Sequence, residues 1–350
     1  MRKITVVLGV GLLMVAVAVF SCKKDQSVDD EDSVAFDIPE GWPHPVYNFE
    51  DNALTQAGFV LGRKLFFETK LSLDNTISCG SCHQPFYAFS QLDHDISHGV
   101  GDSLGIRNSP ALFNLNWHSG FFWDGGVNHI EVQPFNPIQN PVEMAETLQN
   151  VLDKLQADTA YPAMFKAAFG TEEITTQRLG KALAQFMGVL VSANSKYDKY
   201  VRNEAGGEFT DAEEAGLQVY RDKCAACHAE PLFSDFSYRN NGLELVNNSD
   251  GYIDSGRGRI TPDDLSNYYR FKVPSLRNLK YTAPFMHDGR FATIDLVLEH
   301  YTNGIHQTPN LDTLLTNGIT LTDTEKSNLK EFLNTLNDET FVNDERFKQP

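Results

Sequence analysis

Hydrophobic residues recur three or four positions apart in several stretches of the chain, which places them on one face of a helix. These stretches cover residues 54–66, 144–155, 179–190 and 329–336. Thr210 with Glu213, and Thr322 with Glu325, form the pattern in which two side chains cap the start of a helix. Alternating patterns typical of strands are few. The chain is therefore predicted to be mainly α-helical.

A long stretch without a helical period, residues 91–141, is rich in Gly, Asn, Pro and aromatic residues. A structured loop of this length inside a compact domain is usually functional. A second break, Asn-Glu-Ala-Gly-Gly at 203–207, is typical of a hinge. A chain of 350 residues suits two domains. We place them at 46–205 and 206–350.

The first residues have the pattern of an export signal. Arg2 and Lys3 precede an uncharged apolar run at 4–20, like the charged and hydrophobic regions of a signal peptide. The segment Val-Phe-Ser-Cys at 19–22 resembles a bacterial lipobox, in which a small residue precedes a cysteine that becomes lipidated. We therefore expect Cys22 to carry lipid and to begin the mature protein.

This interpretation predicts a signal peptide at 1–21 and a flexible tether at 22–45. The tether begins with a stretch rich in Asp, Glu and Ser that has no helical or strand period. The alternative is an uncleaved membrane anchor, because the apolar run is nearly long enough to span a bilayer. Both alternatives place the body of the protein outside the cytoplasm and tethered to a membrane. We expect a periplasmic protein.

Four of the five cysteines, all except Cys22, fall into two identical patterns. They read Cys-Gly-Ser-Cys-His at 79–83 and Cys-Ala-Ala-Cys-His at 224–228. The pentad Cys-x-x-Cys-His is the attachment site of c-type haem: the thiols bond to the porphyrin, and the histidine binds the iron. The pattern predicts two covalent haems, held through Cys79, Cys82, Cys224 and Cys227, with His83 and His228 as proximal ligands.

Other uses of these cysteines lack their usual context. A zinc site needs four converging ligands, and a thioredoxin-like redox pair lies beside a βαβ pattern. Neither pattern accompanies the pentads. Haem attachment of this kind takes place outside the cytoplasm, in agreement with the export signal.

The formal net charge of −18 bears on the partners of the protein. A polyanion such as nucleic acid would be repelled, so no nucleic-acid partner is expected. A small basic electron-donor protein would instead be attracted over a long range. Solubility alone explains the charge equally well.

Several further motifs resemble those of one known family. They are 107–110 (RNSP), 122–126 (FWDGG), 141–144 (PVEM), 271–278 (FKVPSLRN) and 282–289 (TAPFMHDG). In this order they resemble the bacterial di-haem cytochrome c peroxidase family, including its MauG-like branch. The resemblance extends from about residue 50 to about residue 304. It implies two cytochrome c-like domains, each with one haem, packed against each other.

The resemblance implies catalytic roles for three residues. Glu143 matches the acid–base carboxylate of the family, and Gln133 matches the amide beside it. Breaking the O–O bond of hydrogen peroxide requires a proton to move between its oxygens, which a carboxyl group can do. Trp123 matches the tryptophan between the two haems. The alternatives are a first-turn helix glutamate that stabilises the helix dipole and a core aromatic residue.

The axial ligands beyond the proximal histidines differ within the family. His98 falls where peroxidase members hold a distal histidine at the first haem, which MauG-like members often lack. His94 lies close by in the sequence. At the second haem, peroxidase members use a methionine, whereas Tyr301 occupies that position here, as in the MauG-like branch. Met286 is the competing ligand.

Asn108, Thr282 and Pro284 match the calcium ligands of the family, the last two through backbone carbonyls. Oxygen ligands of this kind suit a hard cation.

The sequence as a whole predicts a peroxidase that takes electrons from a c-type cytochrome or a similar donor. The alternatives are a MauG-like oxidase acting on an organic or protein substrate and a non-catalytic di-haem electron carrier. Members of the family are often homodimers.

Overall fold

Helices joined by long loops make up the part of the chain that the computed structural model describes, residues 34–91, 94–248 and 250–350. Val34–Pro350 forms one compact unit. The predicted signal peptide, the lipidated Cys22 and the first part of the tether lie outside the described residues. Within the described residues, no helix is long and apolar enough to cross a membrane.

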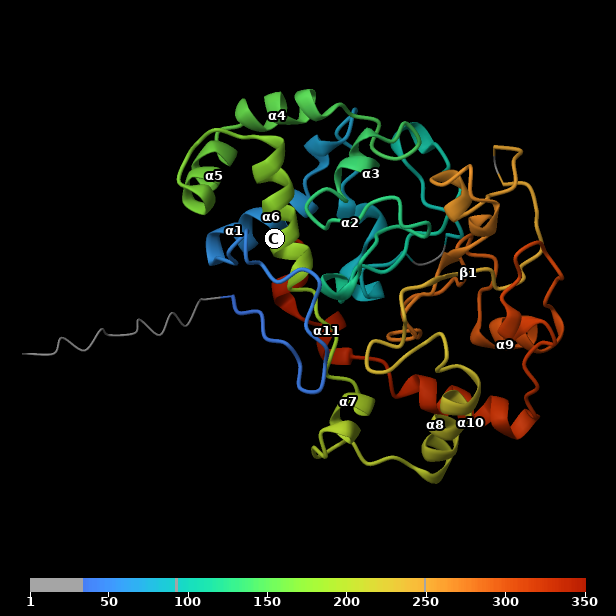
Figure 1. The fold of residues 1–350 in the computed structure, drawn as a ribbon. Coiled ribbons are helices and arrows are strands. Elements are labelled where there is room, and N and C mark those ends of the chain that lie inside the picture. Colours follow the sequence, from blue (N-terminus) through green and yellow to red (C-terminus); the bar gives the residue numbers. More distant parts are fainter. Residues whose placement is uncertain (1–33, 92–93, 249) are drawn as a thin grey trace, which may run out of the picture. The chain divides into compact units, whose positions relative to one another are not determined.

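Four longer helices surround the hydrophobic core of the first half (Figure 1). They are α1 (Gln56–Phe66), α4 (Leu148–Gln156), α5 (Tyr161–Phe169) and α6 (Thr176–Gly188). A methyl group at Gly62 would overlap the carbonyl of Ala182, so α1 and α6 approach each other closely. The predicted helical faces account for this packing, because Leu61, Leu65 and Leu183 are fully buried.

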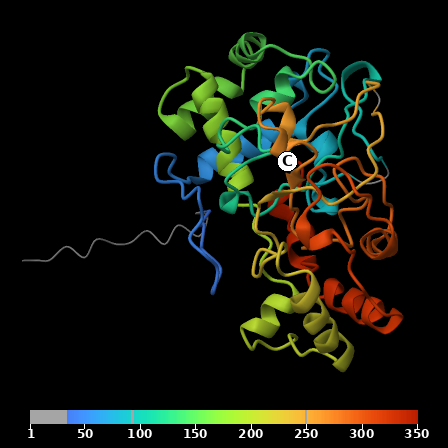
Figure 2. The ribbon, with the colours of Figure 1, turned by 45° about the vertical axis from the view of Figure 1, so that its right-hand side comes forward.

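The second half is built on α8 (Asp211–Lys223) and α10 (Asp323–Asn334), which lie side by side in Figures 1 and 2. Both helices begin with the predicted capping boxes. The remaining helices of this half are α9 (Ile294–Asn303) and α11 (Glu339–Val342). Two short strands, β1 (Tyr238–Arg239) and β2 (Phe271–Lys272), pair antiparallel, with Tyr238 opposite Lys272.

Short helical turns occupy the long connecting segments. The α-helical ones are α2 (Cys79–Cys82), α3 (Phe135–Gln139) and α7 (Lys196–Val201). The 3-10 turns are η1 (Thr69–Leu71), η2 (Pro85–Tyr87), η3 (Val100–Asp102), η4 (Leu115–Trp117), η5 (Arg257–Arg259), η6 (Leu265–Asn267), η7 (Thr313–Leu315) and η8 (Glu345–Phe347). The prediction of a mainly helical fold is confirmed, with the loops as extensive as expected.

Two hydrophobic cores form, and segments cross between them. Phe341, Val342 and Phe347, near the end of the chain, belong to the core of the first half. Tyr197, before the predicted hinge, belongs to the core of the second half. Each half therefore contributes to the core of the other, and the domain division at 205/206 stays a prediction.

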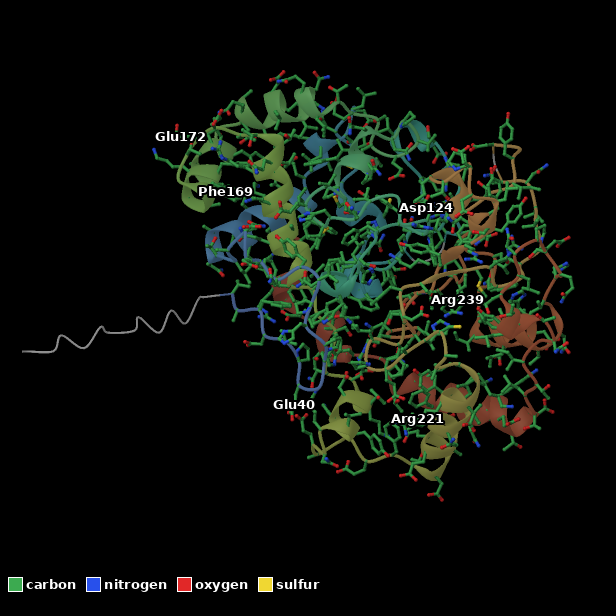
Figure 3. All side chains as sticks on the ribbon, in the orientation of Figure 1. Glu40, Asp124, Phe169, Glu172, Arg221 and Arg239 are labelled. Atoms are coloured by element: carbon green, nitrogen blue, oxygen red, sulfur yellow. The ribbon has the colours of Figure 1, made fainter. Side chains whose placement is uncertain are left out.

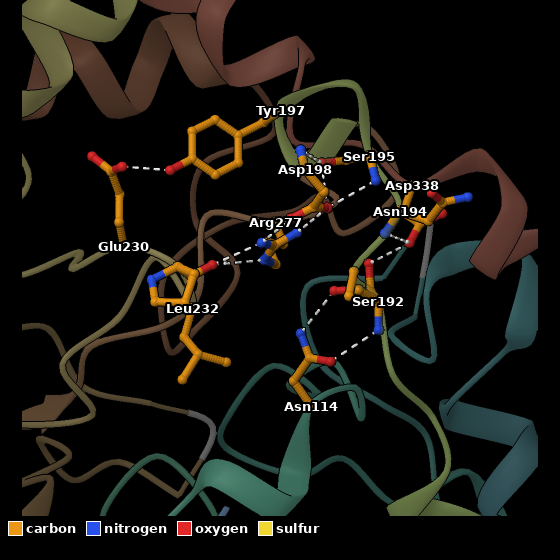
Figure 4. A network of polar contacts seen from close by, with 12 residues as sticks. Asn114, Ser192, Asn194, Ser195, Tyr197, Asp198, Glu230, Leu232, Arg277 and Asp338 are labelled. Carbon is orange, nitrogen blue, oxygen red and sulfur yellow. Dashed lines mark hydrogen bonds and ion pairs between the residues drawn. The ribbon is translucent and has the colours of Figure 1, made fainter. Parts of the chain in front are cut away.

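A buried polar network joins the two halves (Figure 4). The guanidinium of Arg277, which is fully buried, donates two hydrogen bonds to Asp198, at 2.7 and 2.8 Å. Burial alone would raise the pKa of Asp198, but Arg277 lowers it below its ordinary value. The hydroxyl of Ser192 accepts a hydrogen bond from the amide of Asn278, the residue after Arg277. It donates one to the carboxylate of Asp338.

Replacing Arg277 with leucine is expected to lower the free energy of unfolding by about 3–5 kcal/mol, because the buried charge of Asp198 would lose its cationic partner and keep only the hydrogen bonds from Ser195. Chemical denaturation followed by circular dichroism measures the loss. The control is Arg346→Leu, because Arg346 is exposed in its ion pair with Asp344 and should contribute less than about 1 kcal/mol. Equal losses in both variants would contradict this role of Arg277.

Candidate functional site

Both pentads open onto one cavity of about 1170 Å³. The cysteines that line it are Cys79, Cys82, Cys224 and Cys227. None of these four forms a disulfide, and all have intermediate exposure. They are available for thioether bonds to groups inside the cavity, so the residues present fit two covalently attached haems.

The first pentad is shaped by a single helical turn. Ser78 and Ser81 form a capping box at the start of α2, and His83 follows its last residue. The Nδ1 of His83 lies 3.0 Å from the carbonyl of Phe89, and burial lowers the pKa of His83 to about 4. The ring is thus neutral, with Nδ1–H donating to Phe89. This leaves the Nε2 lone pair free for a metal.

The second pentad follows α8 and repeats this arrangement. The Nδ1 of His228 lies 3.0 Å from the carbonyl of Pro274 and 3.3 Å from that of Phe233. Burial lowers the pKa of His228 as well. Each predicted proximal histidine is therefore oriented by main-chain carbonyls, as metal-ligating histidines usually are.

Glu143 and Gln133 both line the cavity, so the structure brings the two predicted catalytic side chains to one space. Burial raises the pKa of Glu143 above its ordinary value, while a hydrogen bond of 2.6 Å from Asn140 acts in the opposite direction. Glu143 lies in a turn, and α4 begins only at Leu148. The alternative of a first-turn helix glutamate is therefore wrong.

His98 lines the cavity, and the segment around it is hydrogen-bonded to the segment that contains Glu143. Its Nδ1 lies 2.5 Å from a carboxylate oxygen of Asp102. The backbone N–H of Val100 donates to the carbonyl of Glu143 at 2.7 Å. The ring of His94 lies 5.0 Å from that of His98, but His94 is not among the residues that line the cavity. The role of His98 as an iron ligand stays a prediction.

Trp123 shares the cavity with both pentads and is held from both halves of the chain. Its indole N–H donates to the carbonyl of Asn108 at 2.8 Å. Its own carbonyl accepts from the backbone N–H of Lys272 at 2.7 Å. These bonds fix an oxidisable ring at the wall of the shared cavity.

Tyr301, on α9, and Met286 both line the cavity near Asn241. Burial raises the pKa of Tyr301 to about 12, and a hydrogen bond with Asn241 acts against this rise. The amide of Asn241 also donates to the sulfur of Met286 at 3.3 Å. The geometry brings both candidate ligands to one place, so the choice of Tyr301 stays a prediction.

The three predicted calcium ligands, Asn108, Thr282 and Pro284, all border the cavity. The backbone N–H of Asn108 donates to the carbonyl of His287 at 2.8 Å, which joins the segments that carry them. The side-chain amide of Asn108 donates to Asp95 at 3.1 Å. The segments are thus in contact, and calcium binding itself stays a prediction.

Sequence reasoning missed an ion-pair cluster beside Trp123. Arg107 donates to Asp124 at 2.6 Å and to Asp254 at 2.5 and 2.9 Å. Figure 3 shows where Asp124 lies in the fold. Sequence reasoning also missed Lys272, which lies almost fully buried at the wall of the cavity. Arg107 and Lys272 are part of the motifs RNSP and FKVPSLRN, but motif membership alone does not indicate burial.

Comparison with known proteins agrees with this geometry. The sequence profile described as di-haem cytochrome c peroxidase matches residues 56–206. The chain is 34% identical over 307 residues to the methylamine utilization protein MauG of Methylorubrum extorquens, which covers 86% of this chain and 83% of that protein. The chain belongs to the di-haem cytochrome c peroxidase family.

Two further relatives represent both branches of the di-haem cytochrome c peroxidase family. The cytochrome c551 peroxidase of Nitrosomonas europaea is 34% identical over 247 residues, 68% of this chain and 71% of that protein. The crystal structure of a MauG-like protein associated with microbial copper homeostasis matches with a TM-score of 0.80 and 31% identity, covering 91% of this chain and 99% of that one. Membership of a di-haem family implies two haems, in agreement with two pentads on one cavity.

Proposed function

We propose that this chain is a peroxidase that reduces hydrogen peroxide to water with electrons from a c-type cytochrome or a similar donor. The observation that carries the proposal is that a partly buried carboxyl group with a raised pKa, Glu143, shares one cavity with both pentads. Named cytochrome c peroxidases among the relatives support it. The overall reaction consumes one peroxide, two electrons and two protons and yields two waters.

Glu143 has the properties of a proton shuttle. The haem at the first pentad, when bound, supplies the iron that binds peroxide and delivers electrons to it. The carboxylate of Glu143 accepts the proton of one peroxide oxygen and donates it to the other, which then leaves as water. The raised pKa of Glu143 makes its carboxylate a stronger proton acceptor, which favours the first of these steps. Gln133 orients peroxide beside it.

Trp123 relays electrons toward the first haem, because it borders the cavity that both pentads share. His83 and His228 would hold the two irons, and Tyr301 would be a further ligand to the second. A calcium ion bound by Asn108, Thr282 and Pro284 joins the segments around Trp123.

The predicted organisation completes this proposal. The peroxidatic haem belongs to residues 46–205 and the electron-accepting haem to residues 206–350. Export to the periplasm with a lipid on Cys22 places the protein at a membrane surface, where a periplasmic donor reaches it. A homodimer is the assembly that the family resemblance implies.

A MauG-like oxidase is the second candidate, and Tyr301 favours it because tyrosine occupies the position where peroxidase members use methionine. Steady-state turnover with peroxide distinguishes the two candidates. We expect a reduced c-type cytochrome to be oxidised faster than a small organic donor. Faster oxidation of the organic donor would favour the oxidase. The absence of turnover with both would favour an electron carrier, against which the placement of Glu143 and Gln133 argues.

A further inference from the structure

A buried lysine at the wall of the cavity has no charged partner among the described residues. Lys272, on β2, is 8% exposed and lines the cavity. Its ammonium donates to the carbonyl of Gly120 at 2.9 Å and lies 3.3 Å from Nδ1 of His118. Burial, together with the nearby Lys272, lowers the pKa of His118 well below its ordinary value, so this ring is neutral. Both contacts of the ammonium are thus uncharged.

The nearby acidic side chain is already engaged. Asp124 acts electrostatically on Lys272, but its carboxylate is bound by Arg107 at 2.6 Å and by the N–H of Gly126 at 2.9 Å. Among the residues that the structure describes, no carboxylate forms an ion pair with Lys272. An ammonium buried without an anion is costly. Consistent with this, burial lowers the pKa of Lys272 to about 8.

The position of Lys272 connects it to the second pentad. Two residues further on, the carbonyl of Pro274 accepts the hydrogen bond from His228. The N–H of Val273 donates to Ser237, on the segment that follows this pentad. The ring of Phe236, on the same segment, lies 4.3 Å from that of His118. The ammonium therefore lies beside the wall that surrounds the second haem site.

We propose that Lys272 binds a propionate carboxylate of the haem attached at Cys224 and Cys227. A propionate is an anion tethered to the haem, and its carboxylate would supply the charge-assisted hydrogen bond that the ammonium lacks. The inference rests on the two-haem assignment of the proposed function. It goes beyond that assignment because it gives Lys272 a role in binding and tuning one particular haem.

The proposed ion pair raises the reduction potential of the second haem. Reduction removes one positive charge from the iron site, so a fixed positive charge nearby favours the reduced form. Replacing Lys272 with methionine leaves the propionate uncompensated. At the wild-type midpoint potential of the second haem, we expect the ferric-to-ferrous ratio to rise about tenfold, which is a lowering of about 59 mV for a one-electron couple.

Spectroelectrochemical titration of the purified full-length holoprotein measures this shift for each haem. Lys272→Met should lower the potential of the second haem and leave the first nearly unchanged, while Lys272→Arg should stay near the wild type. The control is Lys280→Met, on the same segment, because Lys280 is exposed and pairs with Glu339. An unchanged second potential in Lys272→Met, or a shift confined to the first haem, would overturn the proposal. A protein without bound haem would instead overturn the proposed function.

The wild type supplies an independent test that needs no variant to fold. A lysine paired with a propionate keeps its proton, so the potential of the second haem should be flat between pH 7 and 9. An unpaired lysine with a pKa of about 8 would lose its charge in this range, and the potential would fall. The groups that face it are His118, Asp124 and Arg107; burial holds the pKa of His118 well below this range, and Asp254 raises the pKa of Arg107 further above it. A fall through pH 8 would contradict the propionate pair, and a potential that follows the concentration of added chloride or formate would identify a diffusible anion instead.

Discussion

Glu143→Gln is expected to slow the reaction of the reduced protein with hydrogen peroxide by roughly two to four orders of magnitude. The substitution keeps the size of the side chain and its hydrogen-bonding capacity but removes the group that carries the proton. Stopped-flow mixing, followed at the haem absorption bands, measures the rate. Because Glu143 is held in a turn by Asn140 rather than inside a helix, the variant should retain the fold.

The pH dependence of the same reaction gives a second readout. The shuttle begins as a carboxylate, so the rate should fall as the pH is lowered through the pKa of Glu143, which burial has raised above its ordinary value. Glu143→Gln should lose this acidic limb. The control is Glu172→Gln, because Glu172 is exposed and pairs with Lys166 at the surface. The rate of this variant should equal that of the wild type. An unchanged rate in Glu143→Gln would reject the assignment.

Tyr301→Met is expected to raise the reduction potential of the second haem by a substantial part of the roughly 0.8 V range that axial ligands span. A tyrosine oxygen is a hard ligand that stabilises ferric iron, whereas a methionine sulfur favours ferrous iron. The ferric spectrum should change with the ligand. Potentiometric titration with absorption and paramagnetic resonance spectra measures both effects.

Met286 offers the matched control for this experiment, because it shares Asn241 with Tyr301. If Tyr301 is the ligand, Met286→Leu should leave the spectrum and the potential close to those of the wild type. If Tyr301→Met leaves the spectrum and the potential unchanged and Met286→Leu alters them, the ligand is Met286 instead.

Local patterns in the sequence predicted most of the helices, and the structure brings both predicted pentads to one cavity. The pentads place all their chemistry within five consecutive residues, and the capping boxes at Thr210 and Thr322 also act over short distances. The helix predicted at 144–155 begins too early. Met144 continues the hydrophobic spacing of α4 but lies outside that helix. Ala145 instead adopts a positive φ of 55° and ends a turn that begins at Asn140. Spacing alone does not reveal such a turn.

Long-range partners were beyond the reach of the sequence. Arg277 and Asp198 are 79 positions apart, and Arg107 and Asp254 are 147 apart. Nothing local marks these charges as buried, since charged residues usually lie at the surface. Lys272 was missed for the same reason, although its motif was noticed. The catalytic candidates Glu143, Gln133 and Trp123 came from family resemblance, and the structure brings all three to one cavity.

The return of the chain end to the first core affects how this protein matures. The phenyl rings of Phe341 and Phe347 lie 5.9 and 6.5 Å from that of Phe89, whose carbonyl orients His83. The surroundings of His83 are therefore incomplete until Phe341 and Phe347 have packed against Phe89. A fragment that ends near residue 205 would expose Phe89 and hold His83 loosely, so the first half is not an independent haem module.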